Sequence, residues 1–205
     1  MDKSSVTEQK IIKAAANVFM EKGKDGARMQ EIADQAGINK ALLHYYFRSK
    51  EKLFYKVFHL EIPKVVASIF EAYEETDDFQ IFLKSFIDKY IDNIYPRKNL
   101  IRFVLWVGEK SKIEIAGIFL DSFKKHGFKK NPVVIKIEKA IESGQIKPVD
   151  PSNFAMSLIG MCIFPIVAGP LTEKMFPGTK VNDKKYIENR KNEIFNLIWN
   201  GIKAD

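Results

Sequence analysis

The sequence predicts an all-α protein, and three observations lead to this prediction. Apolar residues recur three and four positions apart along most of the 205 residues, which is the spacing of one face of a helix. Strand-type alternation of apolar and polar residues is scarce, and no internal repeat is visible. The apolar fraction of 46% is enough for a core, and 29% charged residues is ordinary for a soluble protein.

The first helix is predicted to begin near Ser5 and to end at Gly23. The Ser-x-x-Glu pattern that starts at Ser5 has the form of a capping box, in which Glu8 reaches back to the cap residue. The segment EKGKDG then stops the helix, because glycine readily adopts the left-handed conformation that follows a helix end. Between these limits lies one apolar stripe: Ile12, Ala15, Ala16 and Phe19.

Two short helices are predicted to follow, and together they form a helix-turn-helix arrangement. The first covers about residues 29–36 and ends at Gly37, and Asn39 caps a second helix that runs to about Phe47. Leu43 and Phe47 lie four positions apart, so we expect them on the inward face of that helix. Its opposite face then carries polar and aromatic residues.

The rest of the chain is predicted to form a larger helical domain. A fourth helix starts after Ser49 and continues to about Tyr73, with a bend at Pro63. Further helices are expected at about residues 78–94, 97–108, 111–125, 131–143, 151–172 and 184–203. Because the composition shifts near residue 50, we place a domain boundary there, which separates residues 1–50 from residues 51–205.

One stretch requires a choice between a membrane span and a buried helix. No residue from Pro151 to Thr172 is charged, and this length is enough to cross a bilayer. Pro165 and Pro170 interrupt it, however, and the sequence contains no second span. We therefore favour a buried helix that breaks near Pro165 and expect no membrane partner, with a transmembrane segment as the alternative.

The bulk composition favours an anionic partner and a reducing compartment. The net charge of +7 favours a partner such as nucleic acid or a membrane surface. The single cysteine, Cys162, excludes an intrachain disulfide, and the N-terminus lacks the apolar stretch of a secretory signal. A cytoplasmic location is therefore expected.

The stretch from Ile11 to Phe54, IIKAAANVFMEKGKDGARMQEIADQAGINKALLHYYFRSKEKLF, resembles the N-terminal domain of TetR/AcrR-type transcriptional regulators. Further on, AIESGQIKPVDPSNFAMSLIG resembles the loop and helix that lead into the dimer-forming part of many members. The resemblance implies a DNA-binding domain joined to a helical domain for effector binding and dimerisation. It also implies a homodimer, usually a repressor, that inserts two third helices into successive major grooves of a palindromic operator. A small molecule then releases the DNA.

The resemblance implies which residues meet DNA: Arg28, Asn39, Lys40, Ala41, His44, Tyr45, Tyr46 and Lys50. Lys40 is expected to reach a phosphate or a guanine, and Lys50 matches a lysine that grips phosphate. For Tyr46, packing against the first helix is an equal alternative. Three positions depart from the family's pattern. Arg28 stands where a capping Thr or Ser is frequent, His44 where tyrosine is common, and Leu42 where a small or polar residue is common.

The C-terminal domain is rich in aromatic residues, and the family implies that an effector pocket and a dimer interface lie there. The pocket candidates are Phe86, Tyr90, Phe103, Trp106, Phe119, Phe123, Met161, Cys162 and Phe164. The dimer-interface candidates are Phe154, Leu158, Ile187, Ile194, Leu197 and Ile198. Such an apolar lining predicts a hydrophobic or amphipathic effector, although each aromatic residue has a place in the core as its alternative.

Two other classes of protein compete with a regulator. An enzyme is disfavoured because the sequence has neither a Gly-rich phosphate loop nor a nucleophile elbow. Its three histidines and one cysteine lack metal-ligand spacing, so we expect no metal and no cofactor, although His44, His59 and His126 could converge in space. The second alternative is a helical protein that binds lipid-like molecules without binding an operator.

Overall fold

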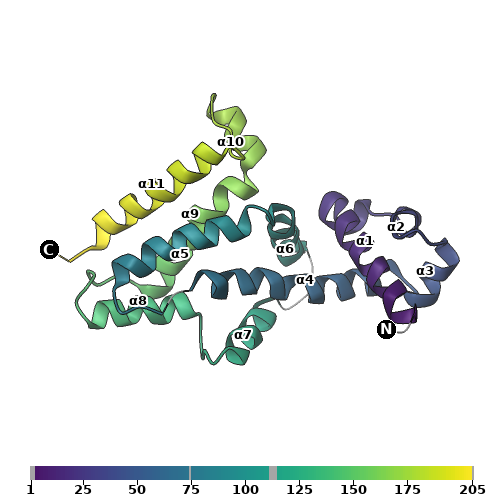
Figure 1. Ribbon diagram of the computed structural model, residues 1–205, viewed down its shortest axis with the longest axis horizontal. Coiled ribbons are helices and arrows are strands. Elements are labelled where there is room, and N and C mark those ends of the chain that lie inside the picture. Colours follow the sequence, from purple (N-terminus) through teal and green to yellow (C-terminus); the bar gives the residue numbers. More distant parts are fainter. Residues whose placement is uncertain (1–2, 74, 111–114, 205) are drawn as a thin grey trace. The chain divides into compact units, whose positions relative to one another are not determined.

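The computed structural model describes residues 3–73, 75–110 and 115–204, and within these ranges the chain is all-α. Figure 1 shows the helices, of which the described residues form eleven, with no strand among them. A single isolated antiparallel bridge joins Ile146 to Lys203. The predicted fold class is confirmed.

The described residues divide into two compact units. The first unit holds the residues up to Val65 together with the α6 residues from Asn99 onward. The second unit holds Val66–Lys98 and the residues from Ile115 onward. Helix α4 (Lys50–Ala72) is continuous from the first unit into the second, so the connection between them is helical rather than a loop.

The first unit contains α1 (Lys3–Gly26), α2 (Met29–Ala36), α3 (Lys40–Tyr46), the first part of α4, and most of α6 (Lys98–Lys110). The regular part of α1 ends at Gly23, with φ 68° and ψ 176°, and α2 ends at Gly37, also with φ 68°. Both predicted stops are confirmed, because these positive φ values favour a residue without Cβ. Residues of all five helices form the core, among them Ile11, Phe19, Ile32, Leu43, Phe54 and Val107.

The second unit contains α5 (Phe79–Ile94), α7 (Ile115–Lys125), α8 (Pro132–Glu142), α9 (Pro151–Val167), α10 (Gly169–Met175) and α11 (Lys184–Ile202). Four of these helices begin after a side chain that accepts a backbone N–H of the first turn: Asp78, Asn131, Asp150 and Asp183. Helices α5, α9 and α11 pack against one another, and in the view of Figure 1 α9 passes behind α5.

The start of the first helix differs from the prediction. Helix α1 begins at Lys3, so Ser5 lies inside the helix and the predicted capping box does not set its start. The start of α4 agrees with the prediction, because the Ser49 hydroxyl accepts the backbone N–H of Lys52 at 3.2 Å. Pro63 lies inside α4, as expected.

The uncharged stretch breaks at Ala168 rather than at Pro165. A proline has no N–H, so Pro165 leaves the carbonyl of Met161, four residues earlier, without its helical donor. The Arg190 guanidinium of α11 donates to that carbonyl at 3.2 Å. Helix α9 therefore continues through the proline because a neighbouring helix supplies the missing donor.

The membrane alternative rests on the same stretch. No single helix among the described residues is long and apolar enough to cross a membrane. Helices α9 and α10 pass a test of length and composition together, but the chain bends by 80° between them. One face of α9 is buried against the rest of the second unit: Ala155, Leu158, Cys162 and Ile166.

Candidate functional site

Helix α3 is held in the first unit by its apolar face and its cap. Leu43 is fully buried, and Phe47, which follows the helix, is 8% exposed. The Asn39 side-chain oxygen accepts the backbone N–H of Leu42 at 2.7 Å, as expected of an N-cap. The inward face and the cap that the sequence predicted are therefore both present.

The outward face of α3 carries most of the predicted DNA contacts. Lys40, Ala41 and His44 are exposed, and Tyr45 is 80% exposed. Tyr46 is partly buried beside it, and the two rings meet edge to face with centroids 5.6 Å apart. The fold thus gathers these side chains on one surface, while their contact with DNA stays a prediction.

Arg28 stands at the start of α2 without capping it. Its backbone is extended, with φ −113° and ψ 136°, and its side chain makes no capping hydrogen bond. Glu31 in the first turn accepts a hydrogen bond from Lys22 of α1 at 2.5 Å. Arg28 is exposed, so its charge is available to a phosphate, as the sequence suggested.

Lys50 lies against the end of α1 and the start of α2, and its contact with a DNA phosphate stays a prediction. Its ammonium donates to the carbonyl oxygens of Asp25 and Ala27, at 3.3 and 3.2 Å. We call residues 24–27, which follow Gly23 at the end of α1 and lead into α2, the α1–α2 turn; both carbonyls belong to it, so Lys50 faces this turn. The neighbouring Glu51 has a lowered pKa, because its carboxylate accepts its own backbone N–H at the helix start and lies near Lys24 and Lys50.

The predicted pocket residues fall into both units. Phe103 and Trp106 belong to the first unit, where both pack against Phe54, with ring centroids 5.6 and 6.4 Å away. Phe86 and Tyr90 of α5 stack on each other at 5.3 Å in the core of the second unit. Two members of the predicted set are therefore placed as packing residues of the first unit.

The other pocket candidates of the second unit differ in exposure. Burial raises the pKa of the Cys162 thiol to about 12, so it stays protonated and unreactive at neutral pH. Phe119 meets Phe123 edge to face at 6.4 Å. Phe164 is 57% exposed and points away from the core, which suits an interface better than an enclosed pocket. Burial likewise raises the pKa of Tyr90.

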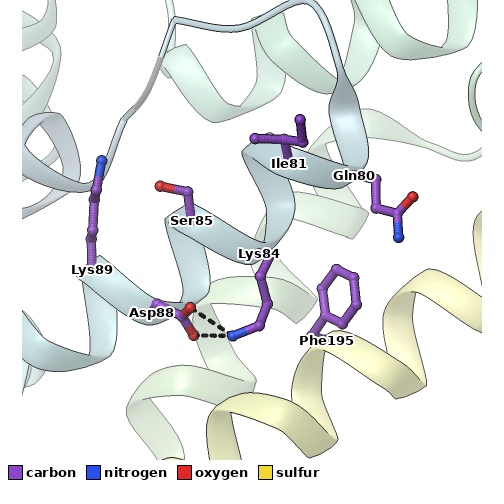
Figure 2. Close-up of a pocket in the computed structure, with 7 residues that line it drawn as sticks. All are labelled: Gln80, Ile81, Lys84, Ser85, Asp88, Lys89 and Phe195. Atoms are coloured by element: carbon purple, nitrogen blue, oxygen red, sulfur yellow. Dashed lines mark hydrogen bonds and ion pairs between the residues drawn. The ribbon is translucent and has the colours of Figure 1, made fainter.

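The second unit also has an open groove that the sequence did not indicate. It has a volume of about 770 Å³ and is lined by one face of α5 and by Phe195 of α11. Figure 2 shows the pair Lys84 and Asp88 beside Phe195, with Nζ to Oδ2 at 2.6 Å. Only the packing of α11 on α5 creates this groove, because its two sides are about a hundred residues apart in sequence.

The predicted dimer-interface residues divide between core and surface. Leu158, Ile194 and Ile198 are buried within the chain itself, where they stabilise the packing of α9 and α11. Phe154 and Ile187 are partly buried, and Leu197 is exposed. Four apolar residues of α9 and α10 that the named interface candidates did not include are also exposed: Met156, Phe164, Val167 and Leu171. Their three- and four-residue spacing was visible in the sequence, but the adjacent buried face has the same spacing.

Among the described residues, no group of three or more His, Cys, Asp or Glu side chains could hold a metal ion. His126 lies against the Phe70 ring with centroids 3.9 Å apart, and its Nδ1 contacts the Ser122 carbonyl oxygen at 2.8 Å. The contacts of His126 are therefore those of a residue that packs within the second unit.

Helices α1–α3, which we call the head, have the arrangement of a helix-turn-helix protein, with an exposed polar and aromatic face on α3. Comparison with known proteins gives the same class. Residues 11–57 match the family profile described as "Bacterial regulatory proteins, tetR family". The HTH-type transcriptional activator FasR of Mycolicibacterium smegmatis is 32% identical over 84 residues, which span 41% of this chain but only 38% of FasR. The HTH-type transcriptional regulator RutR of Escherichia coli O157:H7 is 24% identical over 204 residues, 97% of this chain and 92% of RutR.

Solved structures show the same fold over most of the chain. The structure of AibR in complex with isovaleryl coenzyme A and operator DNA superposes with a TM-score of 0.69, over 93% of this chain and 97% of AibR. Its identity of 19% makes this a likeness of fold alone. Taken together, the comparisons show that residues 11–57 are similar to the TetR family of bacterial regulatory proteins and that the fold of most of the chain is similar to that of AibR.

Proposed function

We propose that this protein is a cytoplasmic transcriptional repressor that binds a palindromic operator as a homodimer and is released by a hydrophobic or amphipathic small molecule. The observation that carries the proposal is the outward face of α3. Lys40, His44 and Tyr45 are all exposed there, while Leu43 anchors the helix from the opposite side. A short helix with this division fits a major groove, where side chains read base edges and phosphates.

The test is binding to DNA from upstream of the protein's own gene, measured by gel shift at several salt concentrations. Lys40→Ala and Tyr45→Ala are expected to weaken binding by about 1–3 kcal/mol each if they contact bases. A lost phosphate contact instead lowers the salt slope by about 0.9. Lys52→Ala is the matched control, because Lys52 is an exposed lysine of α4 for which we expect no DNA contact. If the wild type gives no specific shift but still binds a small molecule, the protein is a ligand-binding protein without an operator.

Dimerisation is supported by the exposed apolar face of α9 and α10. Met156 and Phe164 are 67% and 57% exposed, and Gly160 between them has open space beside its Cα. Leu197 of α11 is 61% exposed. We propose that a second copy covers these residues, because apolar surface of this kind is stabilised by removal from water. Sedimentation or light scattering decides between a dimer and a monomer.

The effector is proposed to bind the second unit, whose core consists mainly of apolar and aromatic residues. AibR was solved with isovaleryl coenzyme A, an amphipathic thioester, so acyl thioesters are the first ligands to test. Mass spectrometry of molecules that co-purify with the protein would identify the class without that assumption. Because FasR is named an activator, a reporter gene in cells with and without the protein must establish the sign of regulation.

A further inference from the structure

The first two turns of α4 hold the α1–α2 turn, residues 24–27, through four contacts. The Lys50 ammonium donates to two of its carbonyls, those of Asp25 and Ala27. Next to it, Glu51 pairs with Lys24 at 3.8 Å. The Lys24 ammonium also lies 5.8 Å from the ring centroid of Phe54, one turn further along α4. Residues 24–27 are therefore attached to α4 as well as to α1.

Arg28 follows this turn directly, so the position of the turn determines the position of Arg28. No side chain caps α2 at Arg28, and its carbonyl accepts the backbone N–H of Ile32 at 3.2 Å as the helix begins. The start of α2 consequently lacks the local hydrogen bond that a Thr or Ser would supply. The contacts from α4 provide the missing constraint from outside the helix.

We propose that Lys50 is a positioning residue, which fixes the α1–α2 turn and thereby places Arg28 and the start of α2 for DNA. Two of the three N–H donors of its ammonium are directed at the turn. The effect of Lys50 on DNA binding rests on the proposed function. The hydrogen bonds from Lys50 to the Asp25 and Ala27 carbonyls, which we call the Lys50 clasp, are present without DNA. The proposed role of Lys50 differs from that of an independent phosphate ligand. It also makes the start of α2 depend on where α4 lies.

A first experiment measures, in the absence of DNA, how strongly the Lys50 clasp protects the backbone amides of the α1–α2 turn from exchange. Hydrogen–deuterium exchange is compared in wild type, Lys50→Met and Lys50→Arg, with Lys52→Met as the control. The Ala27 amide, which donates to the Gly23 carbonyl at 3.2 Å, is expected to exchange on the order of tenfold faster in Lys50→Met. Arginine also donates to carbonyls, so Lys50→Arg should restore most of the protection. The Leu43 amide in α3 reports on general unfolding and should not change.

A second experiment is a double-mutant cycle between Lys50→Met and Arg28→Ala in DNA binding. If Lys50 acts by placing Arg28, Lys50→Met weakens binding in the wild-type background but adds little once Arg28 is gone. If both residues are separate phosphate ligands, the two losses add. In that case each substitution also removes about 0.9 from the salt slope in either background.

The outcomes separate the proposal from the function it rests on. Faster Ala27 exchange together with a non-additive cycle supports it. Unchanged exchange in Lys50→Met, or losses that add with separate salt slopes, overturns it. If the wild type binds no DNA, the proposed function fails, and the exchange measurement alone still decides whether Lys50 fixes the turn.

Discussion

Substitution of Gly23 by alanine tests the account of how α1 ends. Gly23 has φ 68° and ψ 176°, a backbone conformation populated almost only by glycine. Holding an alanine there costs about 1–3 kcal/mol. A Cβ built on Gly23 would lie 3.6 Å from the Trp106 ring, which is ordinary van der Waals distance, so we expect no added clash. The whole loss of stability should therefore come from the backbone.

Thermal and urea unfolding of Gly23→Ala measure this loss. For a chain of this length, 1 kcal/mol corresponds to about 2–4 °C in Tm, so the variant should melt roughly 2–12 °C below the wild type. Gly26→Ala is the matched control, because Gly26 belongs to the same turn without a positive φ. We expect that control to stay within about 0.5 kcal/mol of the wild type.

Two results would refute this reasoning. One is a Gly23→Ala variant as stable as the wild type, which would mean that the turn readily adopts another conformation. The other is rescue of Gly23→Ala by Trp106→Ala, since that would locate the cost in a collision with the ring rather than in the backbone. If the backbone account is correct, the two substitutions destabilise additively.

Three further predictions concern the second unit. Arg190→Met should lower the free energy of unfolding by about 1–3 kcal/mol, because the Met161 carbonyl loses its donor. Adding Pro165→Ala to that variant should restore the lost stability, since the alanine N–H can donate to the same carbonyl. Burial lowers the pKa of Lys191, but its hydrogen bonds to Asp92 and a second carboxylate outweigh this and leave the pKa raised. Lys191 therefore stabilises the fold below its ordinary pKa of 10.5, and the stability difference between wild type and Lys191→Met should shrink as the pH rises through the raised pKa. Leu197→Glu should convert the proposed dimer to monomer in sedimentation without a loss of helix content, and an unchanged dimer would place the interface elsewhere.

Several features of the head could be predicted because they depend on neighbouring residues. Gly37 ends α2, Asn39 caps α3, and Ser49 caps α4 through atoms no more than four residues away. Local chemistry of this kind is readable from sequence. The start of α1 was predicted less well, because a Ser-x-x-Glu pattern also occurs inside helices, and here Ser5 follows residues that continue the helix.

The second unit shows where such reasoning stops. Helical periodicity places Leu158 and Phe164 on helices with equal ease, yet one is buried and the other exposed. Which face is covered depends on the neighbours that the fold brings together, and these lie far away in the sequence. In the first unit, likewise, only the fold brings Phe103 and Trp106 against Phe54, which lies far earlier in the sequence.

By itself, the sequence determined the all-α fold and the helix-turn-helix arrangement, because capping residues, glycine stops and apolar spacing act over a few residues. Only the tertiary structure decided three other matters. It extended α9 through Pro165 with a donor from Arg190, it directed Lys50 to the α1–α2 turn, and it left one apolar face of α9 uncovered. All three depend on which helices the fold brings together. A long side chain such as that of Arg190 or Lys50 turns toward the acceptors within its reach, and an apolar face stays exposed where no helix covers it.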